Sequence, residues 1–373
     1  MPVITMQAEI IREWSRLPAL AAEWNTLLRQ SGADTVFLTW EWVKSWADVV
    51  GQNHTPLVIV VRDPAGSLCG LAPLYLTRYW LVRAWPYRIL RIMADRATGA
   101  EYPDFIVRKD CEREAMRCIV DCLKAIRRQW DCLWLPNVSG WTGARQRAGA
   151  ASELGGFYSH SRTARFAHIE LPASIEAYER SLSDNRRKQF RAQRSKILGK
   201  GCATVTRCAS LAELPSYLQA LFDLHNARRK LLGEEGTFSR QPDETRFYQE
   251  FAPKALAAGW LWLFALRDRG VIKAVQLGYV YNNVFNQMQE GFDPEYTAGA
   301  GNVLRLEVIR ECIARGVRDY DFLGGYTEHK RRWMAQLRHG EDFFIGRASL
   351  ANRVIFLGKV WPTGRYLRPV LAC

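Results

Sequence analysis

The chain has 373 residues, 48% of them hydrophobic and 12% aromatic, so it can fill two ordered cores and lacks the composition of a disordered protein. Its 52 Lys and Arg against 38 Asp and Glu give a formal net charge of +14. This charge favours anionic partners, namely nucleic acid, acidic carrier proteins, phosphorylated substrates or anionic lipid. No window approaches about 18 uninterrupted apolar residues, which argues against a membrane-spanning helix, and Glu9 and Glu13 argue against a signal peptide.

The first half of the chain is predicted to form two helices followed by several strands. Apolar residues recur at intervals of three and four in the first two segments, and the next two extended runs flank a Pro/Gly turn, which is typical of a hairpin. The predicted helices span 17–32, 39–51, 113–129 and 144–154, and the predicted strands span 56–63, 68–80, 87–94, 102–108, 131–138 and 164–172.

The second half repeats this order of elements. Its predicted helices span 174–201, 211–232, 243–259 and 301–316, with a short helix after 325. Its predicted strands span 202–210, 261–268, 271–283, 284–293, 317–325 and 342–349. Two halves with one order of elements indicate a duplicated α/β architecture. We therefore predict two consecutive domains, 1–172 and 173–373, with the long basic helix as the linker.

Cysteine usage indicates reduced thiols and no metal site. The nine cysteines are odd in number, form no CxxC pair and lie mostly in apolar runs. Cys111, Cys118 and Cys122 lie near one face of a predicted helix, but no histidine accompanies them. The apolar and basic stretch 352–373 favours a packed terminal helix over contact with an anionic membrane face. We expect a cytoplasmic location, with peripheral contact at the inner membrane face as the alternative.

Two features of the second half suit anionic ligands. In the turn "DPEYTAGAGN", Gly299 and Gly301 would leave backbone amides exposed at a helix N-terminus, although a plain tight connection explains them too. A basic run without acidic residues follows residue 185, and Arg187, Lys188 and Arg191 would hold the anionic parts of a donor or an acceptor. A solvated interdomain helix is the alternative for this run.

A third feature is the stretch "VRDYDFLGGYTEHKRRW". Asp319 and Asp321 share one face of a strand, and Gly324 and Gly325 then let the backbone approach a ligand. Lys330 returns toward the strand end, where α/β proteins usually place their sites. A surface turn with solvated cations is the alternative.

These residues resemble a known family. The order of elements in the second half and the string "FNQMQEGFDPEYTAGAGNVLRLEVIRECIARGVRDYDFLGGYTEHKRRW" resemble the CelD-type (cellulose-biosynthesis) acetyltransferases of the GNAT superfamily. In the first half "VFLTWEWVKSW", "GLAPLYL" and "EYPDFIV" fit the N-terminal portion of the same proteins. The group is distantly similar to the FemABX peptidyl transferases, which take aminoacyl groups from tRNA. The resemblance covers nearly the whole chain, most specifically 184–333.

The resemblance implies a mixed α/β (α+β) fold of two tandem GNAT-like domains, each with a mixed central sheet flanked by helices. The first domain would be degenerate and would shape the acceptor cleft. The implied chemistry is direct attack of an amine on a thioester or ester carbonyl. Lys330 would stabilise the oxyanion or the leaving group, Glu290 or Asp321 would accept the proton, and Tyr296 or Tyr326 would protonate the leaving thiolate.

The resemblance also assigns binding residues. The predicted donor-binding residues are Tyr296, Gly299, Gly301 and Asn302, and the predicted substrate-binding residues are Arg187, Lys188, Arg191, Gly324, Gly325 and His329. Two positions depart from the family pattern: His329 replaces the aromatic residue of an aromatic-Lys pair, and Tyr296 replaces the Gln or Arg that opens the CoA-binding turn of ordinary GNATs.

The leading hypothesis is an N-acyltransferase of envelope, polysaccharide or amino-acid-derived acceptors. It would bind no permanent cofactor and would use acyl-CoA or an acyl carrier protein as co-substrate, with an amine or hydroxyl acceptor. An aminoacyl-tRNA-dependent transferase is the alternative among enzymes, and the +14 charge suits it. A non-catalytic scaffold of a polysaccharide synthesis complex is the alternative outside enzymes.

Overall fold

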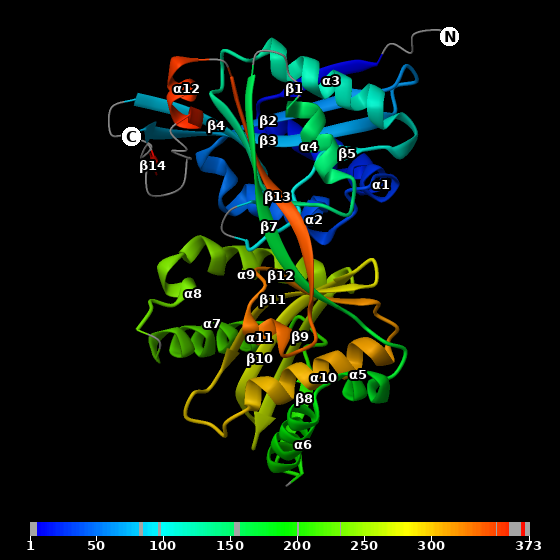
Figure 1. The fold of residues 1–373 in the computed structure, drawn as a ribbon, viewed down its shortest axis with the longest axis vertical. Helices are drawn as coiled ribbons and strands as arrows, with labels where there is room; N and C mark the ends of the chain where they lie inside the picture. The colour runs from blue at the N-terminus through cyan, green and yellow to red at the C-terminus, as the bar shows by residue number, and fades with distance from the viewer. Residues whose placement is uncertain are drawn as a thin grey trace. The chain divides into compact units, whose positions relative to one another are not determined.

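The computed structural model describes residues 6–81, 85–95, 98–152, 157–199, 201–231, 233–347, 349–357 and 367–369. The chain forms two compact units: unit 1 comprises 1–164 and 339–373, and unit 2 comprises 165–338 (Figure 1). This division differs from the predicted domains 1–172 and 173–373, because residues 340–346, near the C-terminal end, pair with a strand of unit 1. The boundary between the units falls inside two long strands, β7 (Phe157–Glu170) and β13 (Gln336–Arg347).

Unit 1 is a mixed sheet with helices packed against it. Its helices are α1 (Ala21–Gln30), α2 (Trp40–Val49), α3 (Glu112–Ala125), α4 (Ala144–Ser152) and α12 (Leu350–Leu357), and its strands besides β7 and β13 are β1 (Gln7–Ile11), β2 (Thr55–Arg62), β3 (Leu68–Leu81), β4 (Trp85–Ile92), β5 (Ile106–Val107), β6 (Cys132–Ser139) and β14 (Leu367–Pro369). Four 3₁₀ helices join them at Trp14–Leu20, Val36–Leu38, Gly51–Asn53 and Lys109–Cys111. The strand order is β1-β2-β3-β4-β6-β13, and α3 packs on β1, β2 and β3 to enclose an aliphatic core.

Unit 2 repeats this plan. Its helices are α5 (Ile175–Ser181), α6 (Asp184–Leu198), α7 (Leu214–Leu231), α8 (Thr237–Arg240), α9 (Pro242–Ala257), α10 (Ala300–Ala314) and α11 (Glu328–Arg331), and its strands besides β7 and β13 are β8 (Ala203–Arg207), β9 (Leu261–Asp268), β10 (Val271–Tyr281), β11 (Val284–Phe292) and β12 (Asp319–Gly324). The strand order is β8-β9-β10-β11-β12-β7. Helix α7 packs on β10 and β11, and α10 packs on β9, β10 and β11, with α5 and α6 against α10.

The strands of the two units therefore follow the same order, and each unit is completed by a strand from the end of the other repeat. In unit 1 β6 pairs antiparallel with β13, and in unit 2 β12 pairs antiparallel with β7. Each unit has a parallel pair of strands, β4 with β6 in unit 1 and β11 with β12 in unit 2. The predicted repeat and the mixed α/β fold class are thus confirmed, while the exchange of the final strands was not predicted.

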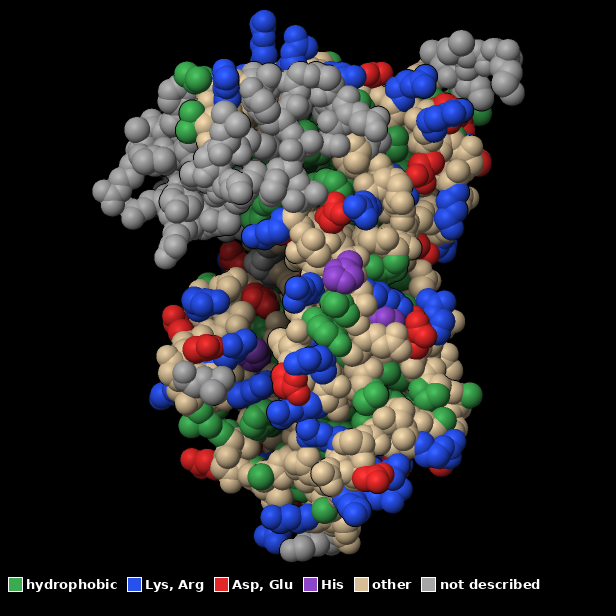
Figure 2. Space-filling view, viewed as in Figure 1, with side chains coloured by type: hydrophobic (Ala, Val, Ile, Leu, Met, Phe, Trp, Pro, Cys, Tyr) green, Lys and Arg blue, Asp and Glu red, His purple; other side chains and the backbone are tan. Residues whose placement is uncertain are grey.

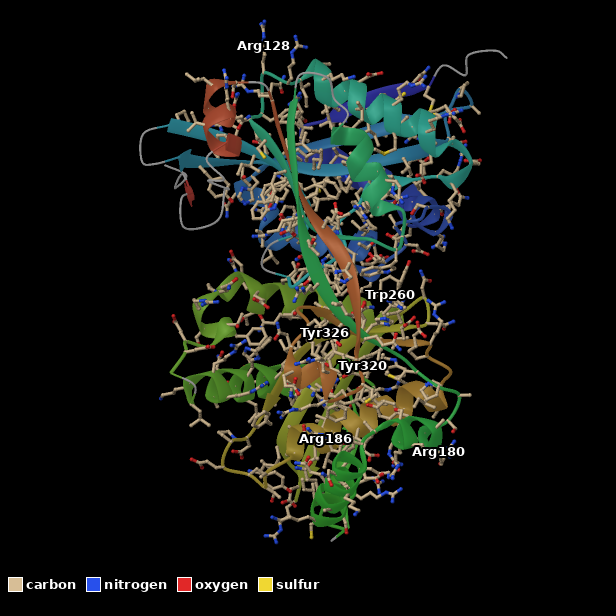
Figure 3. The ribbon with its side chains drawn as sticks, in the orientation of Figure 1. Arg128, Arg180, Arg186, Trp260, Tyr320 and Tyr326 are labelled. Atoms are coloured by element: carbon tan, nitrogen blue, oxygen red, sulfur yellow. The ribbon has the colours of Figure 1, made fainter. Side chains whose placement is uncertain are left out.

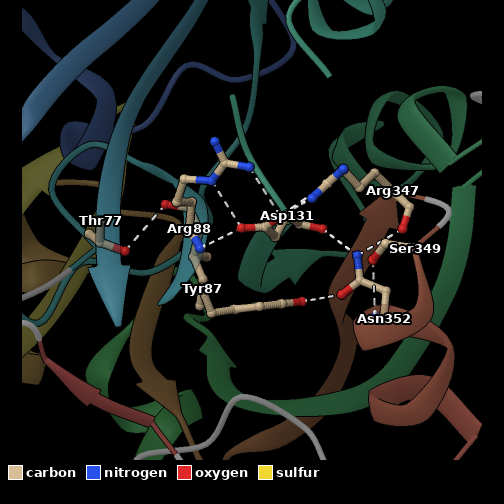
Figure 4. Close-up of polar contacts among 8 residues, drawn as sticks. Thr77, Tyr87, Arg88, Asp131, Arg347, Ser349 and Asn352 are labelled. Carbon is tan, nitrogen blue, oxygen red and sulfur yellow. Dashed lines mark hydrogen bonds and ion pairs between the residues drawn. The ribbon is translucent and has the colours of Figure 1, made fainter. Parts of the chain in front are cut away.

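Asp131 anchors the C-terminal segment in unit 1 (Figure 4). Its carboxylate accepts hydrogen bonds from Arg88 Nε at 3.0 Å and from Arg347 at 2.7 Å. Asn352 donates to the Asp131 carbonyl at 2.6 Å and accepts from the Tyr87 hydroxyl at 2.5 Å. Burial alone would raise the pKa of Asp131, but Arg88 and Arg347 lower it. These contacts explain why residues after β13 pack with unit 1.

The single basic helix predicted over 174–201 is two helices, α5 and α6. The chain is extended at Leu182, and Ser183 restarts the helix because its hydroxyl accepts from the Arg186 amide at 3.4 Å. The cysteines in the described part of the chain are free thiols, and no group of three potential metal ligands occurs there. Among the described helices, none has the length and apolar character needed to cross a membrane. Most of the stretch 352–373 lies outside the described residues.

Candidate active site

The parallel strands at the centre of unit 2 separate before they end. β11 and β12 pair at three positions, the last of them Asn286 with Asp321. Both strands are described along their full lengths, and β11 continues to Phe292 while β12 continues to Gly324. A split therefore opens between the carboxyl ends of two parallel strands, the position at which α/β folds usually bind ligands.

A β-bulge in β11 lies beside this split. Gln289 pairs with Leu277 and Gln287 pairs with Gly278, so Met288 is an extra residue on β11. A bulge bends the strand and leaves the backbone of the extra residue out of the ladder, which is why bulges are frequent next to active sites.

A pocket of about 390 Å³ opens at the end of β11. It is lined by Arg228, Glu290, Phe292, Asp293, Pro294, Tyr296, Thr297, Ala298, Gly299, Ala300, Gly301, Asn302, Arg305 and His329. The structure thus brings together the four predicted donor-binding residues and two further predicted site residues, Glu290 and His329. The other predicted site residues are outside this lining.

The glycine turn forms the N-terminus of α10 at the pocket wall. Gly299 is the N-cap residue with φ of +96°, a left-handed conformation that favours glycine. In the described structure, the amides of Gly301 and Asn302 donate to no protein acceptor, while the neighbouring Val303 amide donates to the Gly299 carbonyl at 2.9 Å. Free amides and the helix dipole together make this turn suitable for an anion.

Helix α6 covers the outer side of the glycine turn through Gln193. A Cβ atom at Gly299 would lie 2.4 Å from Gln193 Cδ, so the turn and the side chain are in close contact. Asn302 Nδ2 also donates to Gln193 Oε1 at 3.4 Å. Any side chain at Gly299 would displace Gln193, a residue that was not predicted to lie near the site.

Arg305 is the electrostatic centre of the pocket. Its side chain is 3% exposed and lies over the rings of Phe322 and Trp333, at 5.6 and 5.0 Å. The guanidinium forms an ion pair with Glu290 and donates to His329 Nε2 at 2.7 Å. Arg305 Nε is buried and has no hydrogen-bond partner among the described residues. Through its ion pair and its hydrogen bond, Arg305 therefore holds Glu290 and His329 together at the pocket wall.

Glu290 is the counter-ion of two arginines. Besides Arg305 it pairs with Arg228 at 3.0 Å. Burial acts to raise the pKa of Glu290, but the charges of Arg305 and Arg228 outweigh it and lower the pKa to about 2. A carboxylate with so low a pKa is a weak base, so this environment argues against the predicted role of Glu290 as proton acceptor.

His329 is a neutral imidazole on the pocket wall. Partial burial and then the positive charge of Arg305 lower its pKa below the ordinary 6.5. Arg305 can only donate, so its contact makes Nε2 of His329 the acceptor and places the ring proton on Nδ1.

Lys330 closes the end of β12. Its ammonium donates to the carbonyl oxygens of Phe322 (2.8 Å), Leu323 (3.3 Å), Gly324 and Gly325 (3.0 Å). An ammonium group has three N–H donors, so these four acceptors share all of them. In this arrangement Lys330 holds a turn together, and it would have to release these carbonyls to act on an oxyanion.

The remaining predicted residues near Lys330 shape the same turn. Asp321 is buried, and its carboxylate accepts from the Leu323 amide at 2.7 Å, which supports the left-handed φ of +61° at Leu323. Gly325 has φ of +83°, so its glycine is required by the turn itself. Tyr326 is half-buried on the unit 2 core, with the Arg331 guanidinium 6.0 Å from its ring (Figure 3).

The predicted substrate-binding residues of the basic helix lie elsewhere. Arg187 forms an ion pair with Asp184, Arg191 pairs with Glu179 at 3.4 Å, and Lys188 is exposed. Arg228 and Arg305, which do line the pocket, were missed. Arg228 stands in a cationic run at a helix end, where charges ordinarily complement the helix dipole. Arg305 could have been noticed as an arginine between two leucines of an apolar helix.

Comparisons with known proteins bear on the type of domain and on the fold. Residues 184–331 match the family model described as acetyltransferase (GNAT) domain, and no curated protein matches the chain. The fold is similar to that of FemX, with a TM-score of 0.62, 13% identity and coverage of 94% of this chain and 99% of that one. It is also similar to L-PGS from Bacillus licheniformis, with a TM-score of 0.53, 12% identity and coverage of 94% and 99%.

The match over residues 184–331 therefore supports an acyltransferase with a domain similar to the GNAT acetyltransferases. The matched segment contains all the residues that line the pocket, from α7, β11, the glycine turn, α10 and α11. The likeness to FemX and L-PGS extends over both units and concerns the fold.

We predict that Lys330→Met destabilises the protein by about 1–3 kcal/mol, because four carbonyl groups lose a charged donor. The measurement is the free energy of unfolding in urea, with Arg331→Met as the control, since Arg331 is exposed and pairs locally with Glu328. Unchanged stability together with lost turnover would restore the catalytic role first predicted for Lys330.

We also predict that Glu290→Gln lowers stability at neutral pH by about 2–3 kcal/mol, because it leaves Arg305 buried without its counter-ion. The folded-state pKa of Glu290 is about 2, below its ordinary 4.5. The stabilisation by the Glu290 carboxylate is therefore complete above about pH 4.5 and disappears as the pH falls toward 2. Unfolding of wild type and variant from pH 7 to pH 2 should show the difference shrinking on acidification; a constant difference would contradict the ion-pair assignment.

Proposed function

We propose that the protein is an N-acyltransferase that moves an acyl group from a phosphopantetheine thioester, in acyl-CoA or an acyl carrier protein, to an amine. One observation carries the proposal: the pocket at the end of β11 combines free helix N-terminal amides with the guanidinium groups of Arg228 and Arg305. Such a set of donors suits the phosphate and carbonyl oxygens of the donor's arm. The GNAT match over 184–331 supports the same chemistry.

In the proposed reaction the amine nitrogen attacks the thioester carbon, and the carbonyl electrons move onto oxygen. Met288, whose backbone leaves the ladder with β10 at the bulge, offers an amide to this oxyanion. The C–N bond forms, the C–S bond breaks and the thiolate leaves. Tyr326, on the loop after β12, is our proposal for the acid that protonates the thiolate. No covalent enzyme intermediate is needed.

His329 is the proposed acceptor of the amine proton. Of the titratable groups on the pocket wall, Glu290 and Asp293 have lowered pKa values, and Arg305 and Tyr296 have raised ones. His329 is neutral at physiological pH and can take a proton when the amine displaces the Arg305 contact. This replaces the earlier prediction that Glu290 or Asp321 acts as the base.

The acceptor class rests on resemblance. The CelD-type sequence features support an amine or hydroxyl acceptor from envelope, polysaccharide or amino-acid metabolism. That unit 1 shapes the acceptor cleft stays a prediction.

Arg228→Ala tests the donor pocket. We expect KM for acyl-CoA to rise about tenfold, because one charged contact to the donor is lost. Arg229→Ala is the matched control, since Arg229 is the next residue and pairs with Glu234 away from the pocket. If both variants change KM for acyl-CoA equally, the pocket is not the donor site. If the protein turns over aminoacyl-tRNA but neither thioester donor, the proposed function is replaced by that of a tRNA-dependent transferase.

His329→Gln tests the base. Glutamine keeps an oxygen acceptor for Arg305 but cannot take a proton at neutral pH. In the wild type kcat should rise with pH through a value below 6.5, because the imidazole acts only when unprotonated. In the variant kcat should no longer rise with pH in this range, and its value should be about 10²-fold lower. His339→Gln, an exposed histidine of unit 1, is the control, and a variant that keeps the pH limb would exclude His329.

A further inference from the structure

We propose that α6 is the docking surface for an acidic acyl carrier protein, so that a carrier-bound acyl group is the preferred donor. The inference deepens the proposed function, on which it rests, by naming the donor for the same pocket. It is carried by the charges of α6 and by the contact of α6 with the glycine turn. The absence of aromatic rings and large apolar side chains from the exposed face of α6 also supports it.

The charge of α6 is strongly one-sided. Its single acidic residue is Asp184, and its cations are Arg186, Arg187, Lys188, Arg191, Arg194 and Lys196. Three of the arginines form ion pairs within unit 2, with Asp184, Glu179 and Glu307, and the last two carboxylates also pair with Arg310. In the described structure Arg186, Lys188 and Lys196 form no ion pair. Figure 2 shows Lys and Arg side chains gathered at the lower end of the picture, where Figure 1 labels α6, and Figure 3 labels Arg186 there.

Two of the cations without an ion pair, Arg186 and Lys196, lie on the flank of α6 next to the donor pocket. Gln193 contacts Gly299 on the pocket wall. Residues three, four and seven positions apart share a helix face, so Arg186, Gln189 and Lys196 are on the same flank of α6 as Gln193. A partner held by this flank is next to the glycine turn and can extend a thioester arm into the pocket.

The surface chemistry of α6 fits an acidic protein better than nucleic acid or a membrane. The apolar residues Phe190 and Ile197 are 3% and 4% exposed and belong to the unit 2 core. The exposed face therefore offers no aromatic ring for base stacking and no apolar side chain for insertion into lipid. Arginine is the residue that binds phosphate in a bidentate manner. Three of the four arginines of α6 are already held in ion pairs. The free lysines are point charges that steer acidic partners.

The size of the pocket agrees with this donor. Its volume of about 390 Å³ is near the lower end of the roughly 300–1,000 Å³ of small-molecule sites. Such a pocket suits a pantetheine arm, while the body of the carrier stays outside on α6.

The test is binding of a fluorescently labelled, palmitoyl-loaded acyl carrier protein to the full chain, followed by anisotropy. We expect the double variant Arg186→Glu with Lys196→Glu to raise Kd at least tenfold and to leave binding of palmitoyl-CoA within twofold. The matched control is Arg113→Glu with Arg117→Glu on α3, two exposed residues with the same change of charge, which should change Kd less than twofold. Wild-type binding should weaken with salt.

Other outcomes overturn the inference. Equal weakening by the α3 control would mean that net charge alone acts, and the milder pair Arg186→Gln with Lys196→Gln guards against a folding defect. Binding of tRNA or of anionic phospholipid vesicles in place of the carrier, lost through the same α6 variant, would replace the partner. If palmitoyl-CoA binds and depends on Arg228 while the carrier does not bind, docking fails and the proposed function stands. If neither thioester binds, the proposed function fails as well.

Discussion

The buried ion pair between Arg305 and Glu290 is the interaction on which the candidate site depends. A guanidinium that is 3% exposed is costly to bury without a counter-ion. Glu290 on β11, His329 on α11 and the rings of Phe322 and Trp333 supply the compensation. The pair therefore fixes α10, β11 and the segment after β12 around one pocket. It also explains why Glu290 keeps its charge and does not serve as a base.

The same topology has a related arrangement in unit 1. There β4 and β6 pair at three positions, the last of them Arg91 with Trp134. Arg91 is buried, pairs with Asp95 and lies 4.1 Å from the centre of the Trp134 ring. Both repeats thus place an arginine, a carboxylate and an aromatic ring at the end of their parallel pair. In unit 2 a glycine turn and a helix N-terminus follow the strand directly, whereas in unit 1 the segment after β4 continues into β5 before α3 begins.

Much of the fold could be predicted from local pattern. Hydrophobic periodicity and turn residues located most helices and strands, and their repeated order indicated two similar units. The glycine turn was recognised because glycines before an apolar helix leave its first amides free. The exchange of β7 and β13 could not be predicted, since strand partners depend on contacts far apart in the chain. Ser183 was overlooked as a cap, so α5 and α6 were predicted as one helix.

The sequence by itself indicated an acyltransferase, and it identified the glycine turn and the stretch after β12 as parts of the candidate site. Only the tertiary structure decided what each charge does. Lys330 was an attractive catalytic candidate, yet four carbonyl groups hold its ammonium. Arg305 was unremarked, yet it lies at the centre of the pocket. The role of a charged side chain depends on its burial and on partners brought by folding from other elements, and neither is encoded in its neighbours along the chain.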